Sequence, residues 1–310
     1  MNQQNKISVT VITGFLGAGK TTFINVLLKK YPEKHFALVE NEFGEVSIDT
    51  KLIRGVDVSQ MFELKEGCIC CTITDEYELV LQELAERFPD VEHLLIETTG
   101  IADPTSVIRP FFKDENLKNI YSFNCTVCLV DALNFENQPE KEISLKQIAV
   151  ADLILINKSE NLLKIQRDKF KNKISQINPL SEIQYSEFGA FGDFQLDKAF
   201  YQSKLLPDIS NGVHLHSKIK TQTISFYVPL NKKDFIEKLS YALDIYKSEI
   251  YRVKGILCFE SEPYEFILQG VGGSFELVES DFLLLSTKSE VVFIGMLEDI
   301  NLSYNGLGPI

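Results

Sequence analysis

Apolar and polar residues follow one another along the first two-thirds of the chain in blocks typical of strands and helices. Short apolar runs predict strands at residues 7–13, 36–39, 94–96, 127–130 and 153–156. Amphipathic stretches between them predict helices, among them residues 22–30, 77–87 and 162–174. Apolar runs without polar alternation are typical of strands buried on both faces. The pattern therefore predicts a mainly parallel sheet flanked by helices.

The pattern changes after a polar stretch that has no clear period and contains Pro207 and Gly212. An alternating strand at 223–228, a helix at 232–246 and three or four strands up to about residue 296 follow it. We therefore predict three parts: an α/β domain at 1–203, a linker at 204–218 and a small α+β C-terminal domain at 219–310.

Composition narrows the class of protein. The 310 residues are 45% hydrophobic and 24% charged, as in soluble globular proteins, and the net charge of −13 argues against nucleic acid or an anionic membrane as partner. The sequence contains neither a signal peptide nor an apolar stretch of about 18 residues, so we expect a cytoplasmic protein without a membrane span. The six cysteines then belong to a reducing compartment, where clustered thiols bind metal or do redox chemistry.

Residues 14–22 read GFLGAGKTT between the first predicted strand and the first predicted helix, which is the sequence and the setting of a P-loop. Its backbone N–H groups and the start of the helix bind phosphates. We expect Lys20 to contact the outer phosphates in catalysis and the Thr21 hydroxyl to bind Mg²⁺. The other predicted nucleotide contacts of the loop are Gly14, Gly17, Ala18, Gly19 and Thr22.

Two further segments follow buried strands, as nucleotide-binding residues do in GTPases. Glu97 ends the strand at 94–96 and Gly100 comes three residues later, which predicts a catalytic, magnesium-side acid and a backbone N–H that senses the terminal phosphate. Asn157 and Lys158 begin the guanine-reading pattern Asn-Lys-x-Asp, but Glu160 replaces its Asp. The extra methylene moves the carboxylate by about 1.5 Å. A P-loop ATPase or small-molecule kinase with structural cysteines therefore stays an alternative to a GTPase.

A cysteine cluster, GCICC at 67–71, predicts a site for a soft metal ion such as Zn²⁺ or Cu⁺. On an extended segment Cys68 and Cys70 share a face and Cys71 points away, so three thiolates meet one ion only where the backbone turns. Two thiolates with an outside carboxylate are an equal alternative. Inert buried cysteines and a redox-sensing cluster are the other interpretations.

An acidic segment follows the second predicted strand and contains four carboxylates, at Glu40, Glu42, Glu45 and Asp49. A solvated acidic loop is the plain interpretation, and a source of metal ligands is the functional one.

The remaining cysteines and two histidines carry less weight. Cys125 and Cys128 lie inside a predicted strand, where a spacing of three turns them to opposite faces, so we expect buried packing. Cys258 lies in an apolar stretch and is also expected in the core. His214 and His216 lie in the predicted linker, as solvated side chains or weak metal ligands.

Together these motifs resemble those of the CobW/YjiA family of P-loop GTPases, whose wider group includes the nickel-insertion proteins HypB and UreG. The resemblance covers nearly the whole chain. It rests on GFLGAGKTT at 14–22, ENEFGEVSID at 40–49, GCICC at 67–71, ETTGIADP at 97–104, VDA at 130–132, NK at 157–158, RVKGIL at 252–257 and VVFIGM at 291–296. It departs from the family at Glu160, and a histidine-rich loop common in many members is reduced here to His214 and His216.

The resemblance implies a slow GTPase with GTP and Mg²⁺ as cofactors that delivers Zn²⁺ or Co²⁺ to a client metalloprotein. It implies that Cys68, Cys70 and Cys71 hold this ion, with Glu40, Glu42 or Glu45 as a carboxylate ligand. From the order of the motifs we hypothesise that GTP holds the acidic segment near the cysteines and that hydrolysis releases the ion. We expect the C-terminal domain to contact the client and a second copy of the chain to form a homodimer. A redox-gated GTPase is the second alternative.

Overall fold

The structure is a computed structural model, and it describes residues 6–42, 45–47, 73–187, 190–191, 194–196, 218–284, 286–298, 300 and 302. The chain divides into two compact units. The first comprises residues 1–147, 151–171 and 181–198, and the second comprises residues 148–150, 172–180 and 199–310. The predicted linker at 204–218 lies almost entirely outside the described residues, so the three domain boundaries stay a prediction.

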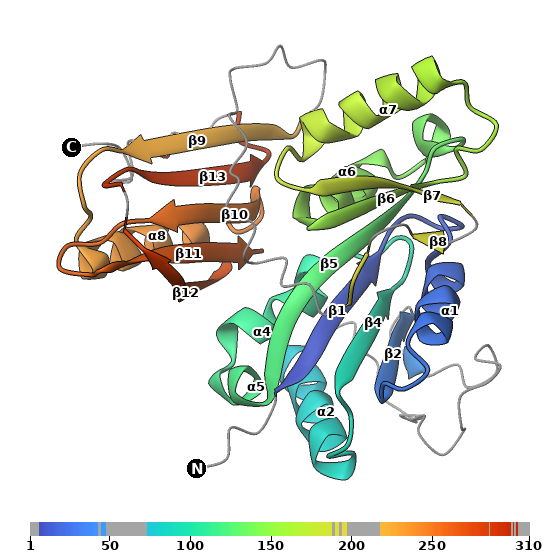
Figure 1. Cartoon of the computed structure of the whole chain (residues 1–310), viewed down its shortest axis with the longest axis horizontal. Helices are drawn as coiled ribbons and strands as arrows, with labels where there is room; N and C mark the ends of the chain where they lie inside the picture. Colours follow the sequence, from blue (N-terminus) through green and yellow to red (C-terminus); the bar gives the residue numbers. More distant parts are fainter. Residues whose placement is uncertain are drawn as a thin grey trace. The chain divides into compact units, whose positions relative to one another are not determined.

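The described part of the first unit contains an eight-stranded sheet in the order β3-β2-β4-β1-β5-β6-β7-β8 (Figure 1). The six central strands pair in parallel, and a short antiparallel strand lies at each edge. The strands are β1 (Ile7–Thr13), β2 (Phe36–Glu42), β3 (Glu45–Ser47), β4 (His93–Thr98), β5 (Tyr121–Asp131), β6 (Leu153–Asn157), β7 (Glu182–Glu187) and β8 (Ala190–Phe191). The predicted mainly parallel sheet is confirmed.

Helices connect these parallel strands, as crossover connections require. Four of the described helices that connect them are long: α1 (Lys20–Lys30), α2 (Ile73–Arg87), α6 (Lys141–Val150) and α7 (Lys164–Ile177). Between β4 and β5 the chain forms three short helices, α3 (Thr105–Ile108), α4 (Pro110–Lys113) and α5 (Glu115–Ile120), and a 3₁₀ turn, η2 (Phe135–Asn137), follows β5. Asp114 begins α5, since its carboxylate accepts a hydrogen bond from Leu117 N at 2.7 Å.

The core of the first unit lies on both faces of the central strands, as their unbroken apolar sequences predict. Every residue of β6 is buried, and so are all but one of the residues of β5. On α1, Phe23 and Leu27 are four positions apart and fully buried, so one face of this helix packs into the core. This packing holds α1 against the sheet. The predicted nucleotide-binding motifs lie at the edge of that sheet where the strands end.

In its described residues the second unit combines an antiparallel sheet with a long helix, and its predicted α+β character is confirmed. Over the described residues the strand order is β12-β11-β10-β13-β9. The elements are β9 (Lys220–Phe226), α8 (Lys232–Ile245), β10 (Ile250–Leu257), β11 (Tyr264–Val271), β12 (Ser274–Leu283) and β13 (Ser289–Gly295). Helix α8 buries Phe235, Leu239, Ala242 and Leu243 in a cluster with strand residues such as Phe293.

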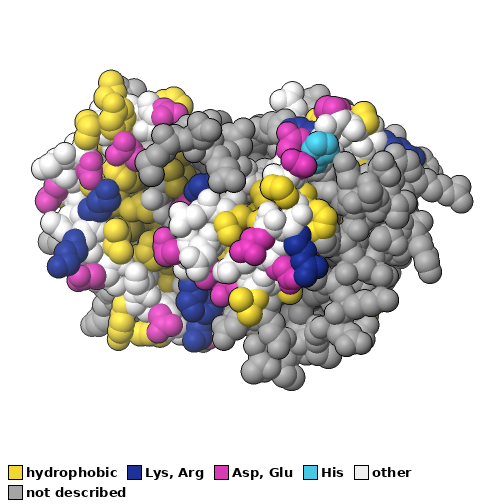
Figure 2. All heavy atoms as spheres, turned by 90° about the horizontal axis from the view of Figure 1, so that it is seen from below, with side chains coloured by type: hydrophobic (Ala, Val, Ile, Leu, Met, Phe, Trp, Pro, Cys, Tyr) yellow, Lys and Arg dark blue, Asp and Glu magenta, His cyan; other side chains and the backbone are white. Residues whose placement is uncertain are grey.

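The second unit also exposes apolar side chains that its own core does not use. In Figure 2, apolar side chains gather on part of the face that is drawn, with charged side chains of both signs around them. Those of the second unit with high exposure are Tyr227, Val228, Tyr241, Ile245, Val278, Phe282 and Leu283. Separately, no helix among the described residues combines the length and apolarity that a membrane span requires.

The buried face of α8 gives the first testable prediction. Leu239→Ala removes a side chain with 0% exposure from this cluster, and we expect the free energy of unfolding of the second unit to fall by about 2–5 kcal/mol. Tyr241→Ala on the same helix truncates a side chain that is 62% exposed, and should change it by less than about 0.5 kcal/mol. Urea titration, combined with hydrogen exchange of the β10 and β13 amides, measures the change in the free energy of unfolding for both variants. Equal effects of the two variants would contradict this packing.

Candidate nucleotide-binding site

The P-loop connects β1 to α1 and lies against the ends of two neighbouring strands. Gly14, Gly17 and Gly19 all have positive φ angles, of 136°, 72° and 105°. A Cβ atom at Gly19 would lie 2.5 Å from Nδ2 of Asn157, so this close approach requires glycine. Gly19 also begins α1, and among the described residues no side chain caps that helix start. Its first N–H groups are therefore available to an anion.

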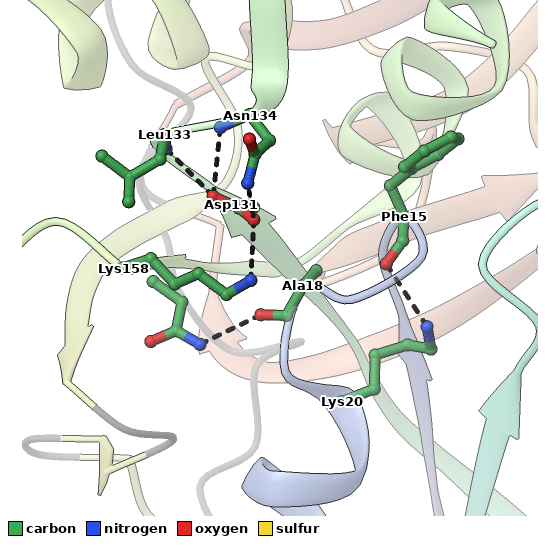
Figure 3. A network of polar contacts seen from close by, with 8 residues as sticks. Phe15, Ala18, Lys20, Asp131, Leu133, Asn134 and Lys158 are labelled. Carbon is green, nitrogen blue, oxygen red and sulfur yellow. Dashed lines mark hydrogen bonds and ion pairs between the residues drawn. The ribbon is translucent and has the colours of Figure 1, made fainter. Parts of the chain in front are cut away.

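Lys20 is 8% exposed and is held by its own loop. Its Nζ donates to the carbonyl oxygens of Gly14 at 3.0 Å and Phe15 at 3.5 Å, the second of which Figure 3 shows. Burial lowers the pKa of Lys20, while the charges of Glu97 and Cys128 oppose that change. A phosphate beside Nζ would stabilise the ammonium form, so the residue suits the predicted contact with the outer phosphates.

The two residues predicted to bind Mg²⁺ meet directly. Thr21 Oγ1, in the first turn of α1, donates to the carboxylate of Glu97, with distances of 3.1 Å to Oε1 and 3.4 Å to Oε2. Glu97 comes from β4, where it pairs in register with Ile12 of β1. Hydroxyl and carboxylate oxygens are the hard ligands that Mg²⁺ prefers, so this pair fits the ion.

Gly100 lies where the segment after β4 touches the P-loop. A Cβ atom at this position would lie 2.4 Å from the backbone N of Leu16 and 2.7 Å from its Cα. Only glycine permits such an approach of two backbones. The structure therefore brings the predicted phosphate-sensing glycine next to the phosphate-binding loop, although its role remains a prediction.

The predicted base-reading residues follow β6. Asn157 Nδ2 donates to the carbonyl oxygen of Ala18 at 3.0 Å, which ties the end of β6 to the P-loop. Lys158 adopts a positive φ of 57° and its Nζ lies 2.8 Å from Oδ2 of Asp131. Glu160 is held through its backbone, since its carbonyl oxygen accepts a hydrogen bond from Arg167 Nη2 at 2.9 Å. Asn157 is thus adjacent to the phosphate-binding loop, as a nucleotide site requires.

Asp131 organises this side of the site, and sequence reasoning assigned it no role. Figure 3 shows its carboxylate between Leu133, Asn134 and Lys158. Oδ1 accepts from the backbone N of Leu133 at 3.0 Å and of Asn134 at 3.1 Å. Oδ2 accepts from Asn134 Nδ2 and from Lys158 Nζ, both at 2.8 Å. Burial raises the pKa of Asp131, but the hydrogen bonds from Lys158, Asn134 and Leu133 outweigh it and leave the pKa lowered. The signals in the sequence were an aspartate ending a buried strand and its place in the VDA motif at 130–132.

The predicted thiolate site lies outside the described residues, which applies to Cys68, Cys70 and Cys71 and also to His214 and His216. Within the described residues no three His, Cys, Asp or Glu side chains form a metal-binding group.

The backbone of the predicted acidic ligands is described, although their side chains are not. Glu40 and Glu42 lie on β2 and Glu45 lies on β3. In the pairing of β2 with β4, Glu40 is in register with Glu97. The acidic segment thus begins one strand away from the predicted magnesium-side acid.

The other cysteines are buried, as the strand pattern predicts. Cys125 and Cys128 are 0% and 1% exposed on β5, and Cys258 is 1% exposed after β10. Burial raises the pKa of the Cys128 thiol to about 12, although the charge of Lys20 acts in the opposite direction. Cys258 Sγ donates to the carbonyl oxygens of Ser286 at 3.1 Å and Lys288 at 3.3 Å. The interpretation of these three as core residues is confirmed.

Comparisons with known proteins identify relatives of both parts of the chain. Residues 8–184 match the family described as "CobW/HypB/UreG, nucleotide-binding domain", and residues 219–304 match "Cobalamin synthesis protein cobW C-terminal domain". The sequence is 33% identical over 291 residues to the zinc chaperone YjiA of Escherichia coli, covering 86% of each chain. It is 27% identical over 338 residues to the zinc-regulated GTPase metalloprotein activator 1 of Schizosaccharomyces pombe, covering 93% of this chain and 82% of the relative.

The fold also matches solved structures. The crystal structure of the Zn(II)-bound YjiA GTPase from E. coli superposes with a TM-score of 0.66 at 27% identity, covering 95% of each chain. A Zn(II)-bound triple mutant of the YjiA GTPase gives a TM-score of 0.69 at 25% identity, covering 99% of this chain and all of that one. Both units of the chain therefore have counterparts in one known architecture.

The hydrogen bonds of Asp131 predict a pH-dependent contribution to stability. Asp131→Asn should lower the free energy of unfolding of the first unit at pH 7 by about 1–3 kcal/mol, because four part-buried hydrogen bonds lose a charged acceptor. The folded pKa lies below the unfolded value of about 3.9, so this contribution is present above that pH and is lost as the pH falls through the folded pKa.

Urea unfolding at pH 7 and at pH 3 would measure how the difference between the wild type and Asp131→Asn shrinks in acid. Glu136→Gln, in an exposed pair with Lys141, is the control and should change stability by less than about 1 kcal/mol. A difference for Asp131→Asn that is the same at both pH values would contradict the ionised role of this carboxylate.

Proposed function

The chain belongs to the CobW/HypB/UreG family of nucleotide-binding proteins, and from this premise we propose that it is a GTPase that delivers zinc to a client metalloprotein. The observation that carries the proposal is the contact of Thr21 with Glu97 beside a P-loop whose lysine is buried within it. That arrangement suits a nucleoside triphosphate with Mg²⁺. The names of the relatives support zinc as the cargo.

We propose that the P-loop binds the phosphates through its backbone N–H groups and the start of α1. Lys20 stabilises the negative charge that develops on the outer phosphates during hydrolysis. Thr21 and Glu97 would hold Mg²⁺, which when bound neutralises phosphate charge. Gly100 donates its backbone N–H toward the terminal phosphate. The other nucleotide contacts of the P-loop in this proposal are Gly14, Gly17, Ala18, Gly19 and Thr22.

The base would lie against the residues that follow β6. Asn157 is fixed to Ala18 of the P-loop, so the base-reading and phosphate-binding elements hold a constant separation. Asp131 fixes Lys158 by an ion pair of 2.8 Å, which leaves the lysine stem as an apolar platform for the base. Glu160 accepts from the base edge in the role that Asp has in the Asn-Lys-x-Asp pattern.

Zinc is the cargo in this proposal, and cobalt is the alternative ion. Cys68, Cys70 and Cys71 bind it as thiolates, so loading releases protons and weakens in acid. Glu40, Glu42 or Glu45 completes the site when GTP is bound. The register of Glu40 with Glu97 supports this link, because a shift at the magnesium-side acid reaches the acidic segment across one strand pair.

We propose that the protein is cytoplasmic and that it binds its client through the second unit. The exposed apolar side chains of that unit, among them Tyr227 and Leu283, support the assignment, because partner surfaces combine apolar and charged groups. A homodimer belongs to the same proposal. An ATPase or kinase and a redox-gated GTPase are the rival functions that the two experiments below separate from it.

Zinc affinity should depend on the nucleotide. We expect the full chain to bind zinc about 5- to 150-fold more tightly with a non-hydrolysable GTP analogue than with GDP, as coupled sites typically do. Competition with a chromogenic zinc chelator at neutral pH measures this ratio.

Two serine variants provide the matched comparison for this experiment. Cys70→Ser should lower zinc affinity, whereas Cys258→Ser should leave it unchanged, because Cys258 is buried and bonded to carbonyl oxygens. Equal zinc affinity with the GTP analogue, with GDP and without nucleotide would contradict GTP-gated delivery. A hydrolysis rate that responds to peroxide but not to zinc would favour the redox-gated alternative.

The site should bind guanine nucleotides more tightly than adenine nucleotides. This preference should increase when Glu160 is replaced by the Asp of the Asn-Lys-x-Asp pattern. We expect GTP to displace a fluorescent nucleotide at a concentration about tenfold lower than ATP, a difference of about 1.4 kcal/mol. Glu160→Asp should widen that ratio, because the shorter carboxylate matches the bidentate geometry of the base edge. Glu115→Asp, at an exposed carboxylate on α5, is the control. Tighter binding of ATP than of GTP would favour the ATPase or kinase.

A further inference from the structure

Helix α6 holds the segment that follows β4. Gln147 on this helix is 1% exposed, and its Nε2 lies 3.2 Å from the carbonyl oxygens of both Gly100 and Ala102. The preceding residue, Lys146, pairs with Oδ2 of Asp103 at 2.6 Å. Two consecutive side chains of one helix thus contact three of four consecutive residues in the segment.

The segment is itself folded into a tight turn. The backbone N of Ala102 donates to the carbonyl oxygen of Thr99 at 3.1 Å. Asp103 Oδ1 accepts from the backbone N of Thr105 at 2.9 Å and from its hydroxyl at 2.7 Å. Because Gly100 also abuts the backbone of Leu16, the turn is held between α6 on one side and the P-loop on another.

Resting on the proposed function, we propose that Gln147 is a positioning residue for recognition of the terminal phosphate. By holding the Gly100 and Ala102 carbonyls, its amide keeps the Gly100 backbone against the P-loop, where the Gly100 N–H can meet the third phosphate. A nucleoside diphosphate lacks that phosphate. Gln147 therefore contributes to discrimination between GTP and GDP without touching either.

The burial of Gln147 is the reason to assign it more than a packing role. Among the described residues, its Oε1 is a buried acceptor with no hydrogen-bond partner. Leaving such an atom unbonded opposes folding, so an apolar side chain of the same size would suit mere packing better. The two donated bonds explain why an amide stands here.

Lys146 is the weaker of the two contacts. The side chains of Lys146 and Asp103 are 20% and 44% exposed, and such ion pairs are screened by water and salt. The geometry therefore assigns the positioning role to Gln147.

The test compares the affinities of the full chain for a non-hydrolysable GTP analogue and for GDP. Gln147→Met keeps the size of the side chain and removes both donors. We expect its affinity for the GTP analogue to fall about 5- to 30-fold, the range of one or two buried hydrogen bonds. We expect its affinity for GDP to stay within about twofold. Lys141→Ala, which breaks an exposed pair with Glu136 at the start of α6, is the control and should change neither affinity.

Gln147→Leu is the second variant in case Gln147→Met does not fold, because it also removes both donors and introduces no buried polar atom. Equal losses of both nucleotides, or no loss of either, would overturn the role of Gln147. If the wild type binds neither nucleotide, the proposed function itself fails. A loss confined to the GTP analogue is a result that general destabilisation would not produce.

Discussion

The site depends on the parallel register of four strands, β4, β1, β5 and β6. Parallel pairing brings the carboxyl ends of these strands to one edge of the sheet, so the loops that follow them must share a small space. At two points they share it so closely that a Cβ atom would collide, at Gly19 against Asn157 and at Gly100 against Leu16. Lys20, Thr21, Glu97 and Asn157 converge because their strands do, although they are far apart in the sequence.

The architecture could largely be predicted from the sequence, because strands buried on both faces require unbroken apolar runs. The apolar run at 7–13 coincides with β1. Polar positions concealed other elements: β7 (Glu182–Glu187) alternates near the edge of the sheet, and β5 begins six residues before its predicted start. Helix α6 was missed because Ser144 and Gln147 are buried beside Ile148 and Val150, which leaves no clear amphipathic period.

The candidate site could be predicted as residue types and motif order but not as a network. Motifs identify Lys20, Thr21 and Asn157, since their chemistry follows local spacing. Asp131 and Gln147 act through residues 27 and 47 positions away, and no local pattern encodes such contacts. The thiolate site stays a prediction, because Cys68, Cys70 and Cys71 lie outside the described residues.

The bond from Asn157 to Ala18 has a consequence for how such a protein can evolve. Under the proposed function, one side chain serves both the base and the loop that binds the phosphates, so a substitution there would impair two tasks at once. A change of nucleobase preference would then arise only from substitutions at positions that have one of these two roles. Under the proposed function Glu160 is such a position, because its described bond to Arg167 uses only its main-chain carbonyl oxygen, so a change of its side chain would alter base preference and leave that bond in place.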